Sequence, residues 1–231
     1  MRLDDAFSFP YNMTLGAIKN DSLVYKVGKR IGYHAKRLGV HINFAPVVDI
    51  NTNPRNPIIG SRSFGEDKFN VANKGISYLK GMHEYGIMGA AKHFPGHGAV
   101  IADSHTEQPI DTRPIDEIEK DIKPYLDLIK IGLPGIMTAH IIYPSIDDLI
   151  TTFSTKWLKE ILREKYSYDG LIFSDDLTMQ SAVEIGSMQK RIHKALYAGC
   201  DFILWCHPDE SIDSVLSELP IDMIDQSKSY Q

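Results

Sequence analysis

One stretch of fourteen residues, Lys92 to His105 (KHFPGHGAVIADSH), concentrates polar residues that could do chemistry. It holds three histidines, a lysine, an aspartate and two glycines. Histidine clusters of this kind either bind a metal ion or move protons to and from a substrate. A zinc site would use His93, His97 and His105 as its ligands.

The spacing of His93 and His97 argues against that zinc site. Histidines four residues apart bind one zinc ion when they share a helical face, but Pro95 and Gly96 lie between these two and disfavour a helix. The sequence has no His-Glu-x-x-His motif and no cysteine cluster to accompany them. We therefore expect no metal ion here.

A catalytic loop fits the same residues better. Lys92 and His93 end an apolar segment, from which their side chains would enter a site. Gly96 and Gly98 would let the loop that follows move and approach a ligand closely.

Asp103 and His105, two residues apart, form a candidate pair for proton transfer. A carboxylate that accepts a hydrogen bond from an imidazole fixes its tautomer, and such a pair suits general acid and base chemistry near neutral pH. The spacing fits a second interpretation equally well, in which Asp103 caps a turn and His105 lies in solvent.

Two adjacent carboxylates, Asp175 and Asp176, end another apolar segment, IFSDDL. Neighbouring side chains of an extended chain point to opposite faces, so we expect one to enter the site and the other to cap the following turn or helix. The inward carboxylate suits a nucleophile, a metal ligand or a structural hydrogen-bond acceptor.

A third motif, GSRSFGED (Gly60 to Asp67), contributes Arg62. Its guanidinium suits binding of an acid or of sugar hydroxyls, or else a salt bridge to a neighbour such as Asp49. Asp67 is expected to cap the helix that follows.

The apolar residues predict alternating strands and helices. Five near-continuous apolar runs are typical of strands buried on both faces, and they cover 43–50, 88–94, 135–142, 170–177 and 200–206. Helical spacing fills the intervals: Asp21 to Gly39, 71–86, Pro114 to Gly132, a short helix after Ser154, 187–198 and 210–219. Pro124 is expected to break or kink the third helix.

Two parallel α/β folds compete for this pattern, the doubly wound sheet and the barrel. A dinucleotide-binding sheet would carry a glycine-rich turn after its first strand, which the sequence lacks. A barrel collects catalytic residues at the carboxyl ends of its strands, where this chain has Asp49, Lys92, His93, His140, Asp175 and Asp176. We predict an α/β fold of the (β/α)8 TIM-barrel type, with about five of the eight strand–helix units, as a single domain over residues 1–231.

The composition is that of an ordinary globular protein. The 231 residues are 43% hydrophobic and 24% charged, enough for one large core. A net charge of -5 gives no general attraction to phosphate backbones, so we expect no nucleic-acid partner. No apolar run approaches the roughly 18 residues of a membrane span, so we expect no membrane partner.

The segment after Met1 (RLDDAF) does not resemble a signal peptide, which favours the cytoplasm and leaves the periplasm open. Cys200 and Cys206 would lie roughly 20 Å apart along one strand, too far for a disulfide. We expect them to be buried free thiols.

Together these motifs resemble a known family. KHFPGHGAVIADSH matches the K-H-F-P-G-H-G-x4-D-S-H signature of the β-N-acetylglucosaminidases (β-hexosaminidases) of glycoside hydrolase family 3. GLIFSDDLTM resembles the strand that carries the nucleophile of that family. INFAPVVDIN, GSRSFGED, PGIMTAHIIYP and AGCDFILWC are similar to its other strand-end segments and follow in the same order.

The resemblance implies a retaining glycosidase without a metal or organic cofactor. Its substrate would be a carbohydrate with a terminal β-linked N-acetylglucosamine, such as a cell-wall or chitin fragment. Asp175 would be the nucleophile, and His105, paired with Asp103, would be the general acid and then the general base. The sugar-binding residues implied are Arg62, Lys92, His93 and Arg2.

Two alternatives stay open beside hydrolysis. A histidine repels phosphate less than a carboxylate does, so phosphate could replace water and make the protein a phosphorylase. Barrels of the family also begin with three further strands, the third ending in a segment like D-Q-E-G-G-x-V-x-R, which Met1 and Arg2 would finish. We then expect unpaired barrel edges that favour self-association, or an inactive sugar-binding remnant.

Overall fold

Five strands pair side by side in the computed structural model, which describes residues 7–101 and 108–218. All neighbouring strands are parallel, and their order, β1-β2-β3-β6-β7, follows the chain. The strands are β1 (Ile42–Asn43), β2 (Met88–Phe94), β3 (Gly135–Thr138), β6 (Leu171–Asp176) and β7 (Phe202–Leu204). Each overlaps one of the five predicted segments, which confirms the predicted parallel sheet.

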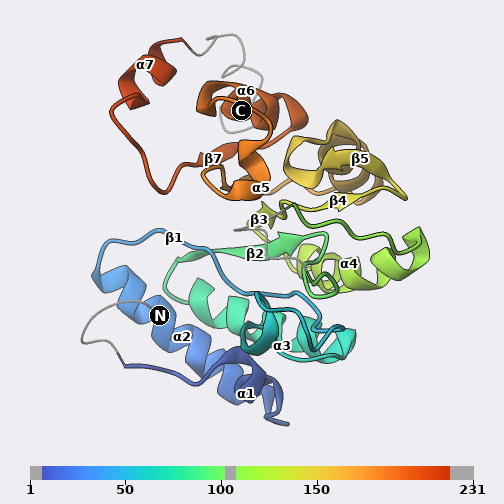
Figure 1. Cartoon of the computed structure of the whole chain (residues 1–231). Coiled ribbons are helices and arrows are strands. Elements are labelled where there is room, and N and C mark those ends of the chain that lie inside the picture. Colours follow the sequence, from blue (N-terminus) through green and yellow to red (C-terminus); the bar gives the residue numbers. More distant parts are fainter. Residues whose placement is uncertain (1–6, 102–107, 219–231) are drawn as a thin grey trace.

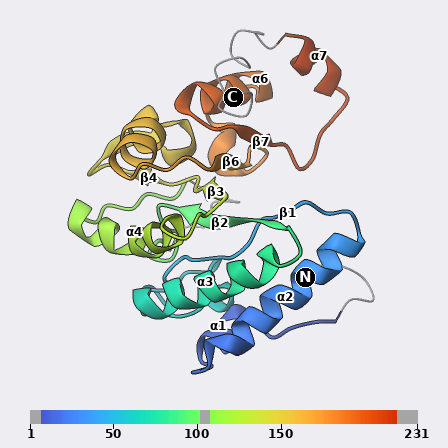
Figure 2. The same ribbon diagram turned by 180° about the vertical axis from the view of Figure 1, so that it is seen from behind.

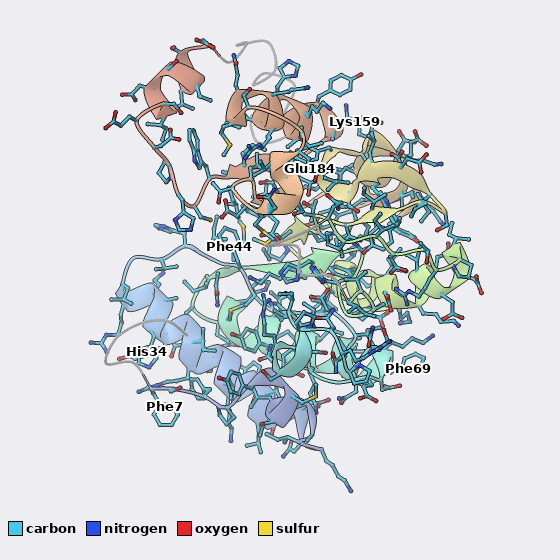
Figure 3. All side chains as sticks on the ribbon, viewed as in Figure 1. Phe7, His34, Phe44, Phe69, Lys159 and Glu184 are labelled. Atoms are coloured by element: carbon cyan, nitrogen blue, oxygen red, sulfur yellow. The ribbon has the colours of Figure 1, made fainter. Side chains whose placement is uncertain are left out.

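Contacts between aromatic rings show that the sheet is curled. Phe44, directly after β1, lies 5.4 Å from Phe173 on β6, measured between ring centroids, and Phe173 lies 5.1 Å from Phe202. Strands β2 and β3 stand between β1 and β6, so a flat sheet would separate Phe44 and Phe173 by roughly 14 Å. The sheet therefore bends round a concave face, where Ala90 and Met137 also pack. Figure 3 labels Phe44, which lies near the middle of the molecule in that view.

This curled parallel sheet is part of a (β/α)8 barrel, with five of the eight strands among the described residues. Helices pack on its other face in a large apolar core. They are α1 (Asn12–Gly16), α2 (Asp21–Arg37), α3 (Lys68–His83), α4 (Ile115–Ile129), the π-helix η3 (Lys156–Lys165), α5 (Gln180–Val183), α6 (Met188–Ala198) and α7 (Ile212–Ser217). Figures 1 and 2 show α1, α2 and α3 at one end of the molecule and α6 and α7 at the other.

Capping side chains set where two of the predicted helices begin. Asp67 accepts a hydrogen bond from the Asn70 N–H at 2.7 Å and caps α3, as predicted. At α2 the cap is Asn20, which accepts from the Ser22 N–H at 3.0 Å. Asp21, the predicted cap, is instead the first helical residue.

Helix α4 runs through Pro124 without a break. We expected this proline to break or kink the helix, and the break does not occur. Pro124 is buried, as are Ile118, Ile122 and Tyr125 of the same helix. Burial of these residues outweighs the single backbone hydrogen bond that proline lacks.

Several short elements were not predicted, because they are too short to show a hydrophobic period. A hairpin of β4 (Ile142–Tyr143) and β5 (Asp147–Ile150) follows β3, and the 3-10 turns η1 (Gly60–Arg62) and η2 (Thr151–Phe153) lie in loops.

Cys200 is a buried free thiol, as predicted. Cys206 is exposed, contrary to the prediction, because β7 ends before it.

Strands β1 and β7 are the two edges of the described sheet. Such edges are the basis for the expected self-association, which stays a prediction. Within residues 7–101 and 108–218, none of the helices has both the length and the apolar character needed to cross a membrane.

Helices α2 and α3 approach so closely that glycine is required at their contact. A Cβ atom built on Gly28 would lie 2.1 Å from the carbonyl oxygen of Tyr78, and one built on Gly81 would lie 2.2 Å from that of Tyr25. Both distances are far inside van der Waals contact. The backbone of each helix therefore packs directly against the other.

We expect Gly81→Ala to lower the free energy of unfolding by about 1–3 kcal/mol, because the added methyl group forces the two helices apart. At an unconstrained helix position the same change would stabilise the protein by about 0.5–1 kcal/mol, so the sign is informative. Denaturant unfolding measures the effect, with Lys80→Ala on the exposed side of α3 as the control. A Gly81→Ala protein as stable as its parent would contradict this packing.

Candidate active site

The carboxyl end of β2 carries Lys92 and His93. The segment after β1 runs beside it: the Lys92 N–H donates to the Pro46 carbonyl at 3.1 Å, and the Val48 N–H donates to the Lys92 carbonyl at 2.9 Å. This pairing extends past the end of β1 and brings Asp49 next to His93.

Asp49 is a fully buried carboxylate that accepts three hydrogen bonds. One oxygen accepts from the backbone N–H groups of His93 (3.0 Å) and His97 (2.8 Å), and the other lies 2.7 Å from Nδ1 of His93. Burial alone would raise the pKa of Asp49, but the interactions with His93 and His97 hold it below its ordinary value. Asp49 is therefore ionised inside the protein.

Buried Asn56 joins the loop that leads to Arg62 to the loop after β2. Its side-chain amide donates to the carbonyls of His97 (2.7 Å) and Val100 (2.8 Å) and accepts from the N–H of Ile59 at 2.7 Å. The loop that carries Arg62 is thus fixed to the loop that follows Lys92 and His93.

The glycines of the loop after β2 serve close packing. A Cβ atom on Gly98 would lie 1.8 Å from the carbonyl oxygen of Ile50, and one on Gly96 would lie 2.8 Å from Cβ of Asp121. The Tyr143 hydroxyl donates to the Gly96 carbonyl at 2.5 Å. Glycine is therefore required at both positions by close packing, and the expected movement of the loop stays a prediction.

At the end of β6 the two carboxylates have different surroundings. Asp176 accepts from the N–H and hydroxyl of Thr178 at 3.0 and 2.6 Å and from the Cys206 N–H at 3.2 Å. It holds the turn after β6, which confirms that one of the pair caps the turn. Asp175 shares the strand face of Phe173, which packs on the concave side, and it is partly exposed.

Asp175 is held in its ionised form by its neighbours. Burial alone would raise its pKa, but the imidazoles of His93 and His140, a hydrogen bond from the Asp176 N–H at 2.8 Å and the charge of Lys92 keep the pKa below its ordinary value. Side chains at the ends of β2 and β3, together with a backbone N–H at the end of β6, therefore act on one carboxylate.

His140, directly after β3, holds the end of β6 through its ring. Nε2 lies 3.1 Å from the Asp176 carbonyl and Nδ1 lies 2.7 Å from the Thr152 hydroxyl. A carbonyl only accepts, so Nε2 carries a hydrogen and donates it to Asp176. Burial lowers the pKa of His140.

Arg62 lies in η1, where its guanidinium donates to the Ile58 carbonyl at 3.2 Å. The alternative salt bridge from Arg62 to Asp49 is not found among the described contacts, since Asp49 is occupied by the two histidines. Three other predicted site residues, Arg2, Asp103 and His105, lie outside the described residues.

The described part of the site suits attack by a carboxylate on an electron-poor carbon. Asp175 is the ionised group, and Lys92 and His93 lie close enough to influence its charge. Within residues 7–101 and 108–218, no group of three or more His, Cys, Asp or Glu side chains is arranged so that it could hold a metal ion.

Four positioning residues were not among the predicted site residues: Asp49, Asn56, His140 and Tyr143. Asp49 and His140 did stand out as polar residues at strand ends, which is a usable signal. Asn56 and Tyr143 act on backbone carbonyls far away in the sequence, and no local pattern indicates such contacts.

Comparison with known proteins places this arrangement in a family. The glycosyl hydrolase family 3 N terminal domain matches residues 1–229. The chain belongs to this family. The resemblance drawn from the strand-end motifs is thereby confirmed.

The chain is similar to several individual enzymes. A β-hexosaminidase of Nitrosomonas eutropha is 41% identical over 226 residues, which cover 94% of this chain and 65% of that protein. The structure of a glycoside hydrolase family 3 β-N-acetylglucosaminidase from Paenibacillus sp. matches with a TM-score of 0.91 and 32% identity, over 97% of this chain and 45% of that one. NagZ from Neisseria gonorrhoeae, solved with N-trifluoroacetyl-D-glucosamine, matches with a TM-score of 0.83 and 32% identity, over 96% and 67%. The chain thus spans just under two thirds of the first of these proteins.

His97 gives the site a testable pH dependence. Burial, followed by the influence of His93, lowers the pKa of His97 to about 4, whereas an unfolded histidine titrates near pH 6.5. Between these values the unfolded chain binds more protons than the native one, so stability falls as the pH drops through this window, by about 3 kcal/mol in all.

We expect His97→Gln to flatten the slope of unfolding free energy against pH between about pH 4 and 6.5, because the residue no longer titrates. Denaturant unfolding at a series of pH values measures the slope. The exposed His41→Gln is the control. Identical slopes for the parent and His97→Gln would show that His97 is not the buried neutral group inferred here.

Proposed function

We propose that this chain is the barrel domain of a retaining glycosidase that releases terminal β-linked N-acetylglucosamine from cell-wall or chitin-type oligosaccharides. The observation that carries the proposal is the ionised Asp175 at the end of β6, under the influence of His93 and Lys92 at the end of β2. Family membership and the names of the relatives, β-hexosaminidase and β-N-acetylglucosaminidase, support this choice of substrate.

In the first step Asp175 attacks the anomeric carbon of the sugar while the bond to the leaving oxygen breaks. Positive charge develops on the sugar ring in the transition state, and an ionised carboxylate stabilises it before the glycosyl ester forms. This role requires Asp175 to be deprotonated at neutral pH, which agrees with its lowered pKa.

His105 supplies the proton for the leaving oxygen, and Asp103 orients its ring. In the second step His105 takes a proton from water, which attacks the anomeric carbon and releases Asp175. Two displacements at one carbon retain the β configuration. A histidine paired with an aspartate thereby replaces the acid/base carboxylate of the usual retaining glycosidase.

The sugar is held by donors from several loops. Lys92 and His93 at the end of β2, Arg62 in η1 and Arg2 bind its hydroxyl groups. Asn56 contacts both the Arg62 loop and the loop after β2. This contact supports the arrangement, because it fixes the position of one loop relative to the other. One domain over residues 1–231 agrees with the single family match to residues 1–229.

We expect Asp175→Ala to lower kcat on an aryl β-N-acetylglucosaminide at least ~1,000-fold, because the covalent step is lost. Added azide enters the space left by the carboxylate and attacks the sugar once, so the product is the α-glycosyl azide. Product NMR and the rate with azide are the measurements. Recovery of the β-glycosyl azide, or activity equal to that of the parent, would contradict the nucleophile role.

We expect His105→Ala to slow hydrolysis according to the leaving group. Aglycones that leave poorly need a proton from His105, whereas a dinitrophenolate leaves without one. The ratio of kcat/KM for the two substrate types measures this dependence. Equal losses for both types would rule out the acid role.

The same assay separates hydrolysis from phosphorolysis when it is repeated with inorganic phosphate. Free N-acetylglucosamine under both conditions supports the hydrolase. A sugar phosphate as the main product would instead establish the phosphorylase alternative.

A further inference from the structure

Asp49 is a charged group with no access to solvent at the edge of the proposed site, since 0% of the residue is exposed. A carboxylate in that position does not reach a substrate, and its burial is unfavourable unless its oxygens accept hydrogen bonds. Its hydrogen bonds come from His93, at the end of β2, and from His97, in the loop that follows. Any effect of Asp49 on a bound sugar therefore passes through these two residues.

The contact between Asp49 and His93 determines where the imidazole carries its hydrogen. An ionised carboxylate only accepts hydrogen bonds, so Nδ1 of His93, at 2.7 Å, must be a donor. This holds for both the neutral and the protonated ring. Nε2 points away from Asp49, and His93 is the side chain with the strongest electrostatic influence on Asp175.

We propose that Asp49 is a positioning residue for sugar binding, which fixes His93 with its hydrogen on Nδ1 and directs Nε2 toward a sugar hydroxyl. The inference rests on the proposed function, in which His93 binds the sugar. The second oxygen of Asp49 holds the backbone at His93 and His97, so one buried group sets both the ring and the loop. Partners that orient metal-binding histidines contribute about 10- to 100-fold to activity, and we expect a similar effect for a sugar-binding histidine.

Replacing Asp49 with asparagine removes the charge of the side chain and keeps its shape. Its side-chain oxygen would keep accepting the backbone N–H groups of His93 and His97, because these donors cannot change. Its amide N–H would then face Nδ1 of His93. Two donors cannot pair, so the ring hydrogen would move to Nε2 and a different group would face the sugar.

We expect Asp49→Asn to lower kcat/KM on an aryl β-N-acetylglucosaminide by about 10- to 100-fold, as for other partners of functional histidines. The matched control is Asp201→Asn, which should leave kcat/KM unchanged. Asp201 is also an enclosed carboxylate, bound to Arg163 at 2.6 Å and to the Ile172 N–H at 2.7 Å, but it lies just before β7, at the opposite end of the strands.

A double-mutant cycle tests whether Asp49 acts through His93. In a His93→Gln background, Asp49→Asn should cause no further loss of kcat/KM. The same 10- to 100-fold loss in that background, or an unchanged kcat/KM for Asp49→Asn alone, would overturn the positioning role.

Long-range proton–nitrogen NMR measures which ring nitrogen of His93 carries the hydrogen, and it needs no substrate. We expect a protonated Nδ1 of His93 in the parent protein and an unprotonated Nδ1 in Asp49→Asn, with assignment from the signals lost in His93→Gln. An unprotonated Nδ1 in the parent would overturn the inference, even where Asp49→Asn fails to fold. A protonated Nδ1 in a parent without glycosidase activity would overturn the proposed function and the sugar-binding role but not the tautomer.

Discussion

The buried carboxylate of Asp49 is the interaction on which the geometry of the site depends. It lies in the segment that continues from β1 and accepts hydrogen bonds from His93 and His97, in the loop that continues from β2. A full charge without solvent is tolerated only when its hydrogen bonds are satisfied, so this contact constrains both segments. Removing the charge while keeping the shape should leave the strands in place and change what His93 presents to a sugar.

The curled parallel sheet explains why residues from distant parts of the chain meet. Parallel strands bring all their carboxyl ends to one edge, and the bend shown by the contact of Phe44 with Phe173 turns that edge into a rim. On this rim His93 and His140, which follow from two other strands, lower the pKa of Asp175. The ring of His140 also donates a hydrogen bond to the carbonyl of Asp176, so it fixes the strand end that carries Asp175.

Much of this arrangement follows from local sequence. Near-continuous apolar runs predicted all five parallel strands, and the polar residues that end them predicted the edge at which the site lies. Asp175 and Asp176 were expected to face different ways because side chains alternate along a strand, and Asp176 does hold the turn. Residues 103 and 105 carry the predicted acid/base pair, which lies outside the described residues.

The errors and omissions have a common physical origin in contacts between distant segments. The close approach of Gly98 to the carbonyl of Ile50 was not predicted. Pro124 was expected to interrupt a helix, but burial of the surrounding apolar face keeps α4 continuous. Asn56 and Tyr143 bind carbonyls about forty or more positions away, which no residue spacing reveals. Local patterns predict elements, whereas these contacts depend on how the elements pack.

The central claim is that Asp175 forms a covalent bond to the sugar. A fluorinated N-acetylglucosaminyl fluoride tests it most directly, because the fluoride leaves readily while the ring fluorine slows release of the ester. Mass spectrometry of the denatured protein, followed by peptide mapping, measures the product. The account predicts one added sugar, carried by the peptide that contains Asp175. An added sugar on a different residue, or steady turnover of the normal substrate by a protein in which Asp175 is never labelled, would contradict it.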